Sequence, residues 1–381
     1  MKENTFRLYF IDIIRAFAIC MMLQGHFVGS LMGEAFYDDS NILFSIWRYC
    51  TGFTAPVFFA VSGFIFMFLM IKESDTKAVG WHNPRVKKGF HRALLLIGIG
   101  YLLRLSFEYV DILHCIGISL LLLIGLYLFA YNKKTYVLPT LLILITLSLF
   151  TFEPLYKSFK FDFLPLPLAN YLTRANGTIF SIFPWFGYVS FGASLGYFFY
   201  KYRNTTNLYR NTIILLTVGI AILWFKSDIF KYIYLTTDSN LFKELFHSEF
   251  LFLRLKNVLL VFLFFIVTRN LITSKILRKI GQNTLSIYVI HCILLYGSIT
   301  GIGLIRFFKY SLNPYVTVIG ALLFILLNVW LSFRYNALKP IISALFSEAK
   351  TEVIRFLQTV FYFLKGWILK VYQWIFSFIK H

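Results

Sequence analysis

The chain has 381 residues, of which 59% are hydrophobic, 20% are aromatic and only 14% are charged. A soluble protein must cover its surface with polar side chains, so this composition excludes a soluble globular protein and predicts a polytopic membrane protein. The net charge of +20 would suggest a nucleic-acid partner in a soluble chain. Here it indicates basic loops and attraction to a membrane surface, and we expect no nucleic-acid partner. The four cysteines are scattered without metal-ligand spacing, so we also expect no metal.

Ten apolar segments predict an all-α fold, a bundle of about ten transmembrane helices in one domain at residues 10–335. The predicted spans are 10–31, 52–71, 89–107, 112–131, 136–152, 178–200, 211–227, 251–271, 284–305 and 314–333. The span at 136–152 is short for a bilayer. At residues 339–381, basic residues recur among Phe, Trp, Ile and Leu, as in FLKGWILKVYQWIFSFIK. This pattern predicts a basic amphipathic helix in the cytoplasmic membrane interface.

The charges of the loops predict the orientation of the bundle. Residues 72–92, between the second and third spans, carry six Lys and Arg residues, and the other loops of the same parity are also basic. The opposite loops contain most of the acidic residues. The positive-inside rule then places both termini in the cytoplasm, and predicts an integral, multi-pass protein of the plasma (cytoplasmic) membrane.

The first span contains three polar residues that a bilayer disfavours, in the sequence DIIRAFAICMMLQGH. Asp12 and Arg15 are three residues apart, so they share a helix face and are expected to pair. Arg15 and His26 are eleven residues apart, which is about three helical turns plus 20° and roughly 16 Å along the axis. All three therefore lie on one stripe, and charged groups inside a span indicate function. The alternative is a buried packing pair with an interfacial histidine.

The predicted orientation divides the polar residues into an inner and an outer group. The inner group is Asp12, Arg15, Lys87, Lys88, His91 and Arg92, and the outer group is His26, Arg104, Glu108, Asp111, His114 and Trp185. Two polar sites joined by one helix suit a reaction that crosses the membrane. The donor would be acyl-CoA, whose phosphates Arg and Lys bind well. Arg15, paired with Asp12, would hold a phosphate or the pantetheine carbonyls of the donor, and Lys87, Lys88 and Arg92 would attract its nucleotide end.

In this hypothesis an imidazole at His26 takes a proton from the acceptor or carries the acyl group briefly. Asp111 orients or balances a histidine, His114 lies on the acceptor side, and Arg104, Glu108 and Trp185 bind the acceptor. These residues also have purely structural interpretations. His114 could cap the interface, the basic loop could only determine topology, Arg104 and Glu108 could form a helix-end pair, and Trp185 could belong to the aromatic belt. His291, in LSIYVIHCILLY, could bond a neighbouring helix or line the path.

The run IDIIRAFAICMMLQGHF resembles the first span of the transmembrane acyltransferase superfamily, with its arginine, ten residues and then histidine. The pieces FTAPVFFAVSGF, DILHCIGISLLLL and FPWFGYVSFGASLGY resemble more narrowly the bacterial relatives of heparan-α-glucosaminide N-acetyltransferase. The segment GQNTLSIYVIHCILLY is similar to a late span of the acyltransferase-3-like proteins. The resemblance covers residues 10–335 in order.

The resemblance implies a membrane acyltransferase that moves an acyl group, typically acetyl, from cytoplasmic acyl-CoA to a sugar amine or hydroxyl on the far side. The motif residues of the family fall on Asp12, Arg15, His26, His114 and the pair Pro184–Trp185. One departure is Ala16, where the family usually has glycine.

Two other functions remain open at this point. A transporter or a lipid or glycan carrier would also use charged residues inside spans, although the chain shows no inverted repeat. A non-catalytic member that exports or anchors a polymer through partner proteins is the third. For the enzyme, the acceptor is a glycan or lipid-linked sugar of the cell envelope, and a homo-oligomer is compatible with the Gly-rich helix faces.

Overall fold

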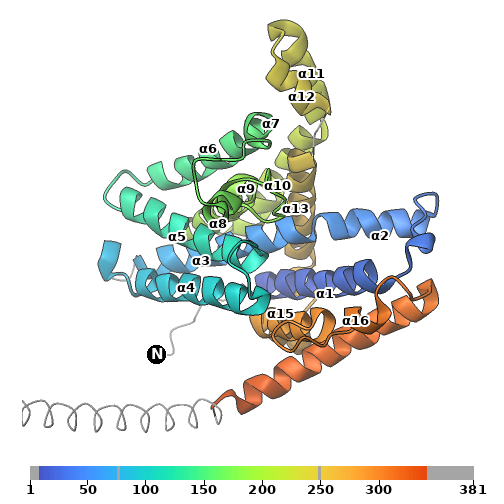
Figure 1. Cartoon of the computed structure of the whole chain (residues 1–381). Coiled ribbons are helices and arrows are strands. Elements are labelled where there is room, and N and C mark those ends of the chain that lie inside the picture. Colours follow the sequence, from blue (N-terminus) through green and yellow to red (C-terminus); the bar gives the residue numbers. More distant parts are fainter. Residues whose placement is uncertain (1–7, 75–77, 248–249, 341–381) are drawn as a thin grey trace, which may run out of the picture. The chain divides into compact units, whose positions relative to one another are not determined.

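The computed structural model describes residues 8–74, 78–247 and 250–340, and in these ranges the fold is all-α. Several helices have nearly the length of a predicted span, and short helices connect them (Figure 1). The labelled α-helices are α1 (Tyr9–Leu31), α2 (Ile42–Gly52), α3 (Thr54–Ser74), α4 (Pro84–Arg104), α5 (Ile112–Ala130), α6 (Val137–Thr151), α7 (Glu153–Tyr156), α8 (Leu166–Leu172), α9 (Ile182–Lys201), α10 (Leu208–Trp224), α11 (Lys226–Thr237), α12 (Asn240–His247), α13 (Phe250–Val267), α14 (Lys275–Gln282), α15 (Thr284–His291) and α16 (Ile305–Phe308). A further α-helix, without a label, is Pro314–Pro340. The 3₁₀-helices are η1 (Glu34–Phe36), η2 (Gly80–His82) and η3 (Thr268–Asn270), and η4 (Cys292–Tyr296) is a π-helix.

A helix occupies each of the ten predicted spans, but fewer than ten are long and apolar enough to cross a membrane. Five helices of the described chain meet both conditions, or six if α10 and α11, which meet at 51°, form one bent span. The five are Tyr9–Leu31, Ile42–Ser74, Ile112–Ala130, Phe250–Asn270 and Pro314–Pro340. A polytopic helical protein is therefore confirmed, and the count of ten is not.

The predicted span 284–305 is wrong at its C-terminal end. Helical structure ends with η4 at Tyr296, because Gly297 and Gly301 adopt positive φ angles of 72° and 70°. Such angles are left-handed and suit glycine, which has no Cβ. The apolar pattern continues through this turn, so hydropathy alone extended the span too far.

The chain divides into two compact units, Met1–Asn328 and Val329–His381. The division falls within the helix Pro314–Pro340. Residues 341–381, which include most of the predicted amphipathic tail, lie outside the described residues. The site described below lies in the first unit.

Two close backbone contacts fix the helices around the site. A Cβ on Gly192 of α9 would overlap the carbonyl oxygen of Ala60, so only glycine lets α9 approach α3 this closely. A Cβ on Gly281 of α14 would overlap the carbonyl oxygen of Asp12 in the same way. As a result α3 packs directly on α9, and α14 and α15 pack on α1 (Figure 1).

The connection between α4 and α5 is set by local sequence. The α4 helix ends at Arg104 because Leu105 adopts the left-handed conformation, with φ 50° and ψ 30°. Asp111 is the N-cap of α5, since its carboxylate accepts the Ile112 amide at 2.7 Å. Its own N–H donates to Nδ1 of His114, which completes a capping box.

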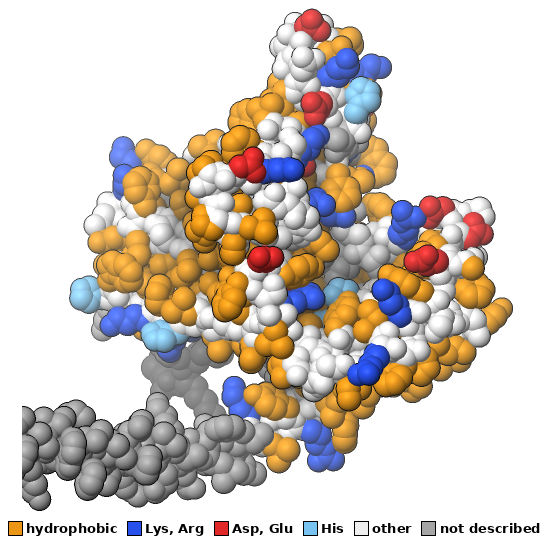
Figure 2. Space-filling view, in the orientation of Figure 1, with side chains coloured by type: hydrophobic (Ala, Val, Ile, Leu, Met, Phe, Trp, Pro, Cys, Tyr) orange, Lys and Arg blue, Asp and Glu red, His pale blue; other side chains and the backbone are white. Residues whose placement is uncertain are grey.

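The surface has the character expected of a helix bundle in lipid. Apolar side chains cover wide areas of the face shown in Figure 2, and Asp and Glu lie mainly at its periphery. One acidic group is the segment before α2, where Glu34, Asp38 and Asp39 are exposed. Another is at α12, where Glu244 pairs with Lys157 at 3.0 Å.

Candidate active site

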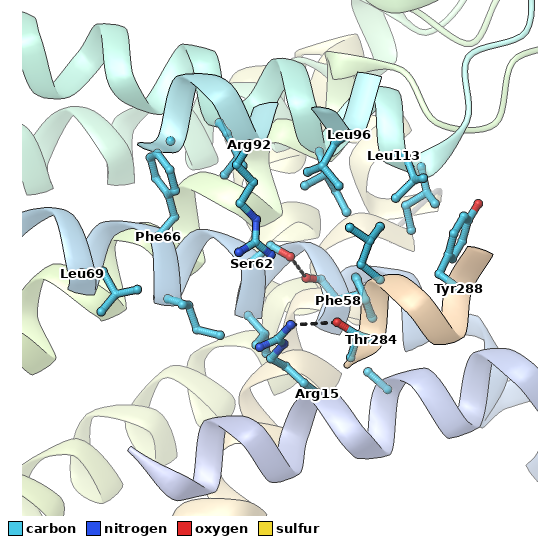
Figure 3. Close-up of a pocket in the computed structure, with 18 of the residues that line it drawn as sticks. Arg15, Phe58, Ser62, Phe66, Leu69, Arg92, Leu96, Leu113, Thr284 and Tyr288 are labelled. Carbon is cyan, nitrogen blue, oxygen red and sulfur yellow. Dashed lines mark hydrogen bonds between the residues drawn. The ribbon is translucent and has the colours of Figure 1, made fainter. Parts of the chain in front are cut away.

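Residues of α1, α3, α4, α5 and α15 line a cavity of about 190 Å³, which we call the inner cavity (Figure 3). Its apolar wall includes Phe58, Phe66, Leu69, Leu96 and Leu113. Four cationic side chains line it, and no Asp or Glu of the described chain does; they are Arg15, Arg85, Lys88 and Arg92. The cavity therefore combines apolar walls with an excess of positive charge, which suits an anionic ligand with an apolar arm.

Arg15 is held in the inner cavity by a bond to another helix. Its guanidinium Nη2 donates to the hydroxyl of Thr284 on α15 at 2.8 Å, and Arg92 of α4 reaches into the same cavity (Figure 3). The predicted direct pair of Arg15 with Asp12 is not formed, because the two side chains have separate hydrogen-bond partners. Asp12 is buried and accepts the side-chain amide of Gln282 at 3.0 Å. Asp12 therefore links α1 to α14 and does not line the cavity.

A second cavity of about 510 Å³, the outer cavity, lies around His26. Four predicted site residues line it: His26, Arg104, Asp111 and Trp185. Two further arginines, Arg174 and Arg254, also line it. The guanidinium of Arg254 lies over the Phe250 ring, 3.3 Å from its centroid.

The two cavities share part of their walls. Met22, Phe58, Ile112 and Tyr288 line both. Along α1, Arg15 lines only the inner cavity and His26 only the outer one, with Met22 between them. The predicted stripe on the first span thus runs from one cavity to the other, through an apolar constriction.

Asp111 is the centre of a hydrogen-bond network at the outer cavity. Its Oδ2 accepts from Arg104 Nε at 3.0 Å and from the Tyr288 hydroxyl at 2.8 Å. Burial by itself would raise the pKa of this carboxyl group, but Arg104 and the bonds from Tyr288 and the Ile112 amide outweigh burial and hold the pKa below its ordinary value. Asp111 is therefore an anion that fixes Arg104 and Tyr288.

Three more predicted site residues, Lys87, Glu108 and His114, line neither cavity, and Trp185 lines the outer cavity as a buried residue. Lys87 is exposed and lines neither cavity. Glu108 is exposed in the non-helical connection, so it does not pair with Arg104 as a helix-end pair would; its backbone carbonyl accepts from Asn170 at 2.7 Å. His114 is buried behind Asp111, beside the ring of Tyr101 at 4.2 Å, and lines neither cavity. Trp185 is buried, and its Nε1 donates to the Ile179 carbonyl at 2.8 Å, so it is not an interfacial belt residue.

His26 contacts a second histidine. Its Nδ1 lies 3.1 Å from Nε2 of His291, the last residue of α15. Nδ1 of His291 bonds to the backbone carbonyl of Tyr288. His291 is completely buried, and the π-helix η4 begins at the next residue. Irregular π-helical turns often occur at functional sites.

Several of these residues were not predicted as site residues, although His291 was expected either to bond a neighbouring helix, as it does, or to line the path. Thr284, Tyr288 and His291 stand four and three residues apart, which places them on one face of α15 toward α1. A polar stripe inside an apolar segment is the signal that could have found them. Arg174 is in a connection and Arg254 is in α13, and no local pattern distinguishes these arginines from topology-determining charges.

The comparisons with known proteins agree with the resemblance seen in the first span. Residues 7–232 match the family described as "Heparan-alpha-glucosaminide N-acetyltransferase, catalytic". No curated protein sequence matches the chain. The matched residues include α1 through α10 and therefore the predicted site residues, while α13 and α15 lie beyond them.

Proposed function

The chain belongs to the heparan-α-glucosaminide N-acetyltransferase catalytic family, and on this premise we propose that it transfers an acyl group, most simply acetyl, from acyl-CoA to a sugar amine or hydroxyl across the membrane. The observation that carries this proposal is the single face of α1 that presents Arg15 to a cationic cavity and His26 to a second cavity. A donor site and an acceptor site on opposite sides of one constriction are what such a reaction requires.

The inner cavity is the proposed donor site. Its four cations suit the phosphates of coenzyme A, and its apolar wall suits the pantetheine arm. Arg15, Lys88 and Arg92 keep the roles expected from the sequence, and Arg85 joins them. Asp12 would act only by positioning α1 against α14. Lys87 would contribute only to the positive charge of the loop, which by the positive-inside rule is cytoplasmic.

The proposed chemistry uses His26 as a general base. The acceptor amine or hydroxyl attacks the thioester carbonyl carbon while an imidazole nitrogen of His26 takes the acceptor proton. A C–N or C–O bond forms, the C–S bond breaks, and the departing thiolate of coenzyme A receives the proton from His26. Both substrates must therefore reach the constriction between the cavities, where Met22 and Tyr288 line both cavities.

The outer cavity is the proposed acceptor site, and its charge indicates what kind of acceptor it binds. Asp111 is its one acidic lining residue among those described, and it is already paired with Arg104. Arg174 and Arg254 leave the cavity with an excess of positive charge. We expect an acceptor sugar that carries a carboxylate, sulfate or phosphate near the group to be acylated. Trp185 contributes to the wall of this cavity.

The test uses purified protein in detergent with radiolabelled acetyl-CoA. Wild-type protein is expected to bind the donor and to hydrolyse it slowly or acylate itself. Arg15→Ala should weaken donor binding by about tenfold, since a charge-assisted hydrogen bond contributes about 1.5–3 kcal/mol. His26→Ala should bind the donor normally and lose turnover by at least about a hundredfold.

Other outcomes would contradict the proposal. If the folded wild-type protein binds no acyl-CoA, the donor site is wrong and a carrier becomes the better explanation. A carrier would lose transport in Arg15→Ala and tolerate His26→Ala. If His26→Ala keeps its turnover, the donor site stands but the base is another residue.

A further inference from the structure

We propose that His291 is a positioning residue that fixes the tautomer of His26, so that the free nitrogen of the base is Nε2. This inference rests on the proposed function only for its catalytic consequence. The geometry that supports it is the contact between the two rings, 3.1 Å from His26 Nδ1 to His291 Nε2, and the bond from His291 to the Tyr288 carbonyl.

The first step concerns the proton on His291. A carbonyl oxygen only accepts hydrogen bonds, so the Nδ1 atom of His291 that bonds to it must carry a hydrogen. In a neutral imidazole the other nitrogen then has a lone pair, so Nε2 of His291 is an acceptor. His291 is buried completely and forms no hydrogen bond or ion pair with an acidic side chain of the described residues, which favours the neutral ring.

The second step passes this assignment to His26. Because Nε2 of His291 accepts, Nδ1 of His26 must be the donor at 3.1 Å. The neutral ring of His26 then has its lone pair on Nε2. No hydrogen bond to Nε2 of His26 is formed within the described part of the chain, and His26 lines the outer cavity. A base needs this free lone pair.

The third step is the comparison with the other tautomer. Without a hydrogen-bond acceptor at Nδ1, the ring of His26 can carry its hydrogen on Nε2. In that tautomer Nε2 has no free lone pair and cannot take a proton from the acceptor sugar. A partner that fixes the tautomer of a catalytic histidine is a known requirement of acid–base sites. In most such sites the partner is a carboxylate or carbonyl, whereas here it is a second imidazole whose own tautomer is fixed by the backbone of α15.

The test compares two variants of His291. His291→Gln keeps a side-chain oxygen that can accept from His26 Nδ1, and His291→Phe removes the acceptor. Neither leaves the Tyr288 carbonyl unbonded, because the Cys292 amide also donates to it. Both variants are therefore expected to fold, which thermal unfolding in detergent will check.

The direct readout is ¹⁵N NMR of histidine-labelled protein, in which protonated and unprotonated ring nitrogens have different chemical shifts. The chain has seven histidines, and the His26→Gln spectrum identifies the signals of His26. Wild type and His291→Gln should show His26 with hydrogen on Nδ1, and His291→Phe should show the other tautomer or a mixture. In acetyl-CoA turnover, His291→Phe should lose about a hundredfold in kcat, within the range of a lost acid–base contribution. KM for acetyl-CoA should be unchanged, and His291→Gln should recover most of kcat.

Two results would overturn the inference. One is the same His26 tautomer in wild type and in His291→Phe. The other is full turnover in a His291→Phe protein whose tautomer has changed. The NMR result does not depend on turnover, so an absence of acyl transfer in wild type would reject the proposed function and leave the tautomer assignment to be judged separately.

Discussion

The ion pair of Asp111 with Arg104 can be compared with a second Asp–Arg pair in the same chain. Asp39 and Arg48 lie 2.5 Å apart, closer than the 3.0 Å between Asp111 and Arg104. The side chains of the shorter pair are 70% and 63% exposed, while that of Asp111 is 4% exposed. Burial, and not distance, should decide which pair contributes more to stability.

The size of the effect follows from the bonds that Asp111→Ala removes. Loss of the N-cap of α5 costs about 1 kcal/mol. The buried Tyr288 hydroxyl is left without its acceptor, which costs about 1–3 kcal/mol. Arg104 is 30% exposed, so water replaces part of its lost partner. The free energy of unfolding should fall by about 3 kcal/mol for Asp111→Ala and by less than about 1 kcal/mol for Asp39→Ala.

The assay is thermal unfolding of the purified variants in one detergent. At about 1.3 °C per kcal/mol for a chain of 381 residues, Asp111→Ala should lower the midpoint by roughly 4 °C and Asp39→Ala by less than about 1.3 °C. Asp111→Asn has one side-chain oxygen, so it can keep either the N-cap bond from the Ile112 amide or the bond from Tyr288, but not both, and it should fall between them. If Asp111→Ala unfolds at the wild-type temperature, or if Asp39→Ala falls as far, burial does not govern these pairs and the reasoning fails.

Two further variants test the acceptor site and the packing. Arg254→Glu should raise KM for an anionic acceptor by about tenfold or more, because one charge-assisted contact is lost, and it should leave donor binding unchanged. The control is Arg306→Glu, which changes an exposed residue outside both cavities. Equal KM values for the two variants would show that Arg254 does not belong to the acceptor site. Gly192→Ala should lower the folded yield and the thermal stability, because the added Cβ would overlap Ala60. In the control Gly98→Ala the added Cβ has nothing within 4 Å, so this variant should be neutral or stabilised by up to about 1 kcal/mol. A Gly192→Ala protein as stable as wild type would show that α3 and α9 can separate without loss of stability.

The sequence predicted the features that depend on a single helix. The stripe from Arg15 to His26 follows from the helical period alone, and the structure places both residues on cavity walls joined by Met22. The presence of a helix in each predicted span follows from apolar length in the same way. The family match over residues 7–232 then confirmed the resemblance that those motifs suggested.

The features that depend on contacts between helices could not be predicted in this way. His26 and His291 are 265 residues apart, and Arg15 and Thr284 are 269 residues apart. No local spacing specifies which helix faces which. The expected helix-end pair of Arg104 with Glu108 is not formed for a local reason: Leu105 ends α4 in a left-handed conformation that the apolar pattern does not reveal.

The helix α15 connects the two cavities. Its three inward residues bond in turn to Arg15, to Asp111 and to His26, so one short helix contacts the proposed donor site, the constriction and the proposed base. If a ligand displaces Thr284 from Arg15 and so moves α15, it moves the same element that supports His26. The two substrates are then thermodynamically linked: whatever factor the donor applies to the affinity for the acceptor, the acceptor must apply to the affinity for the donor.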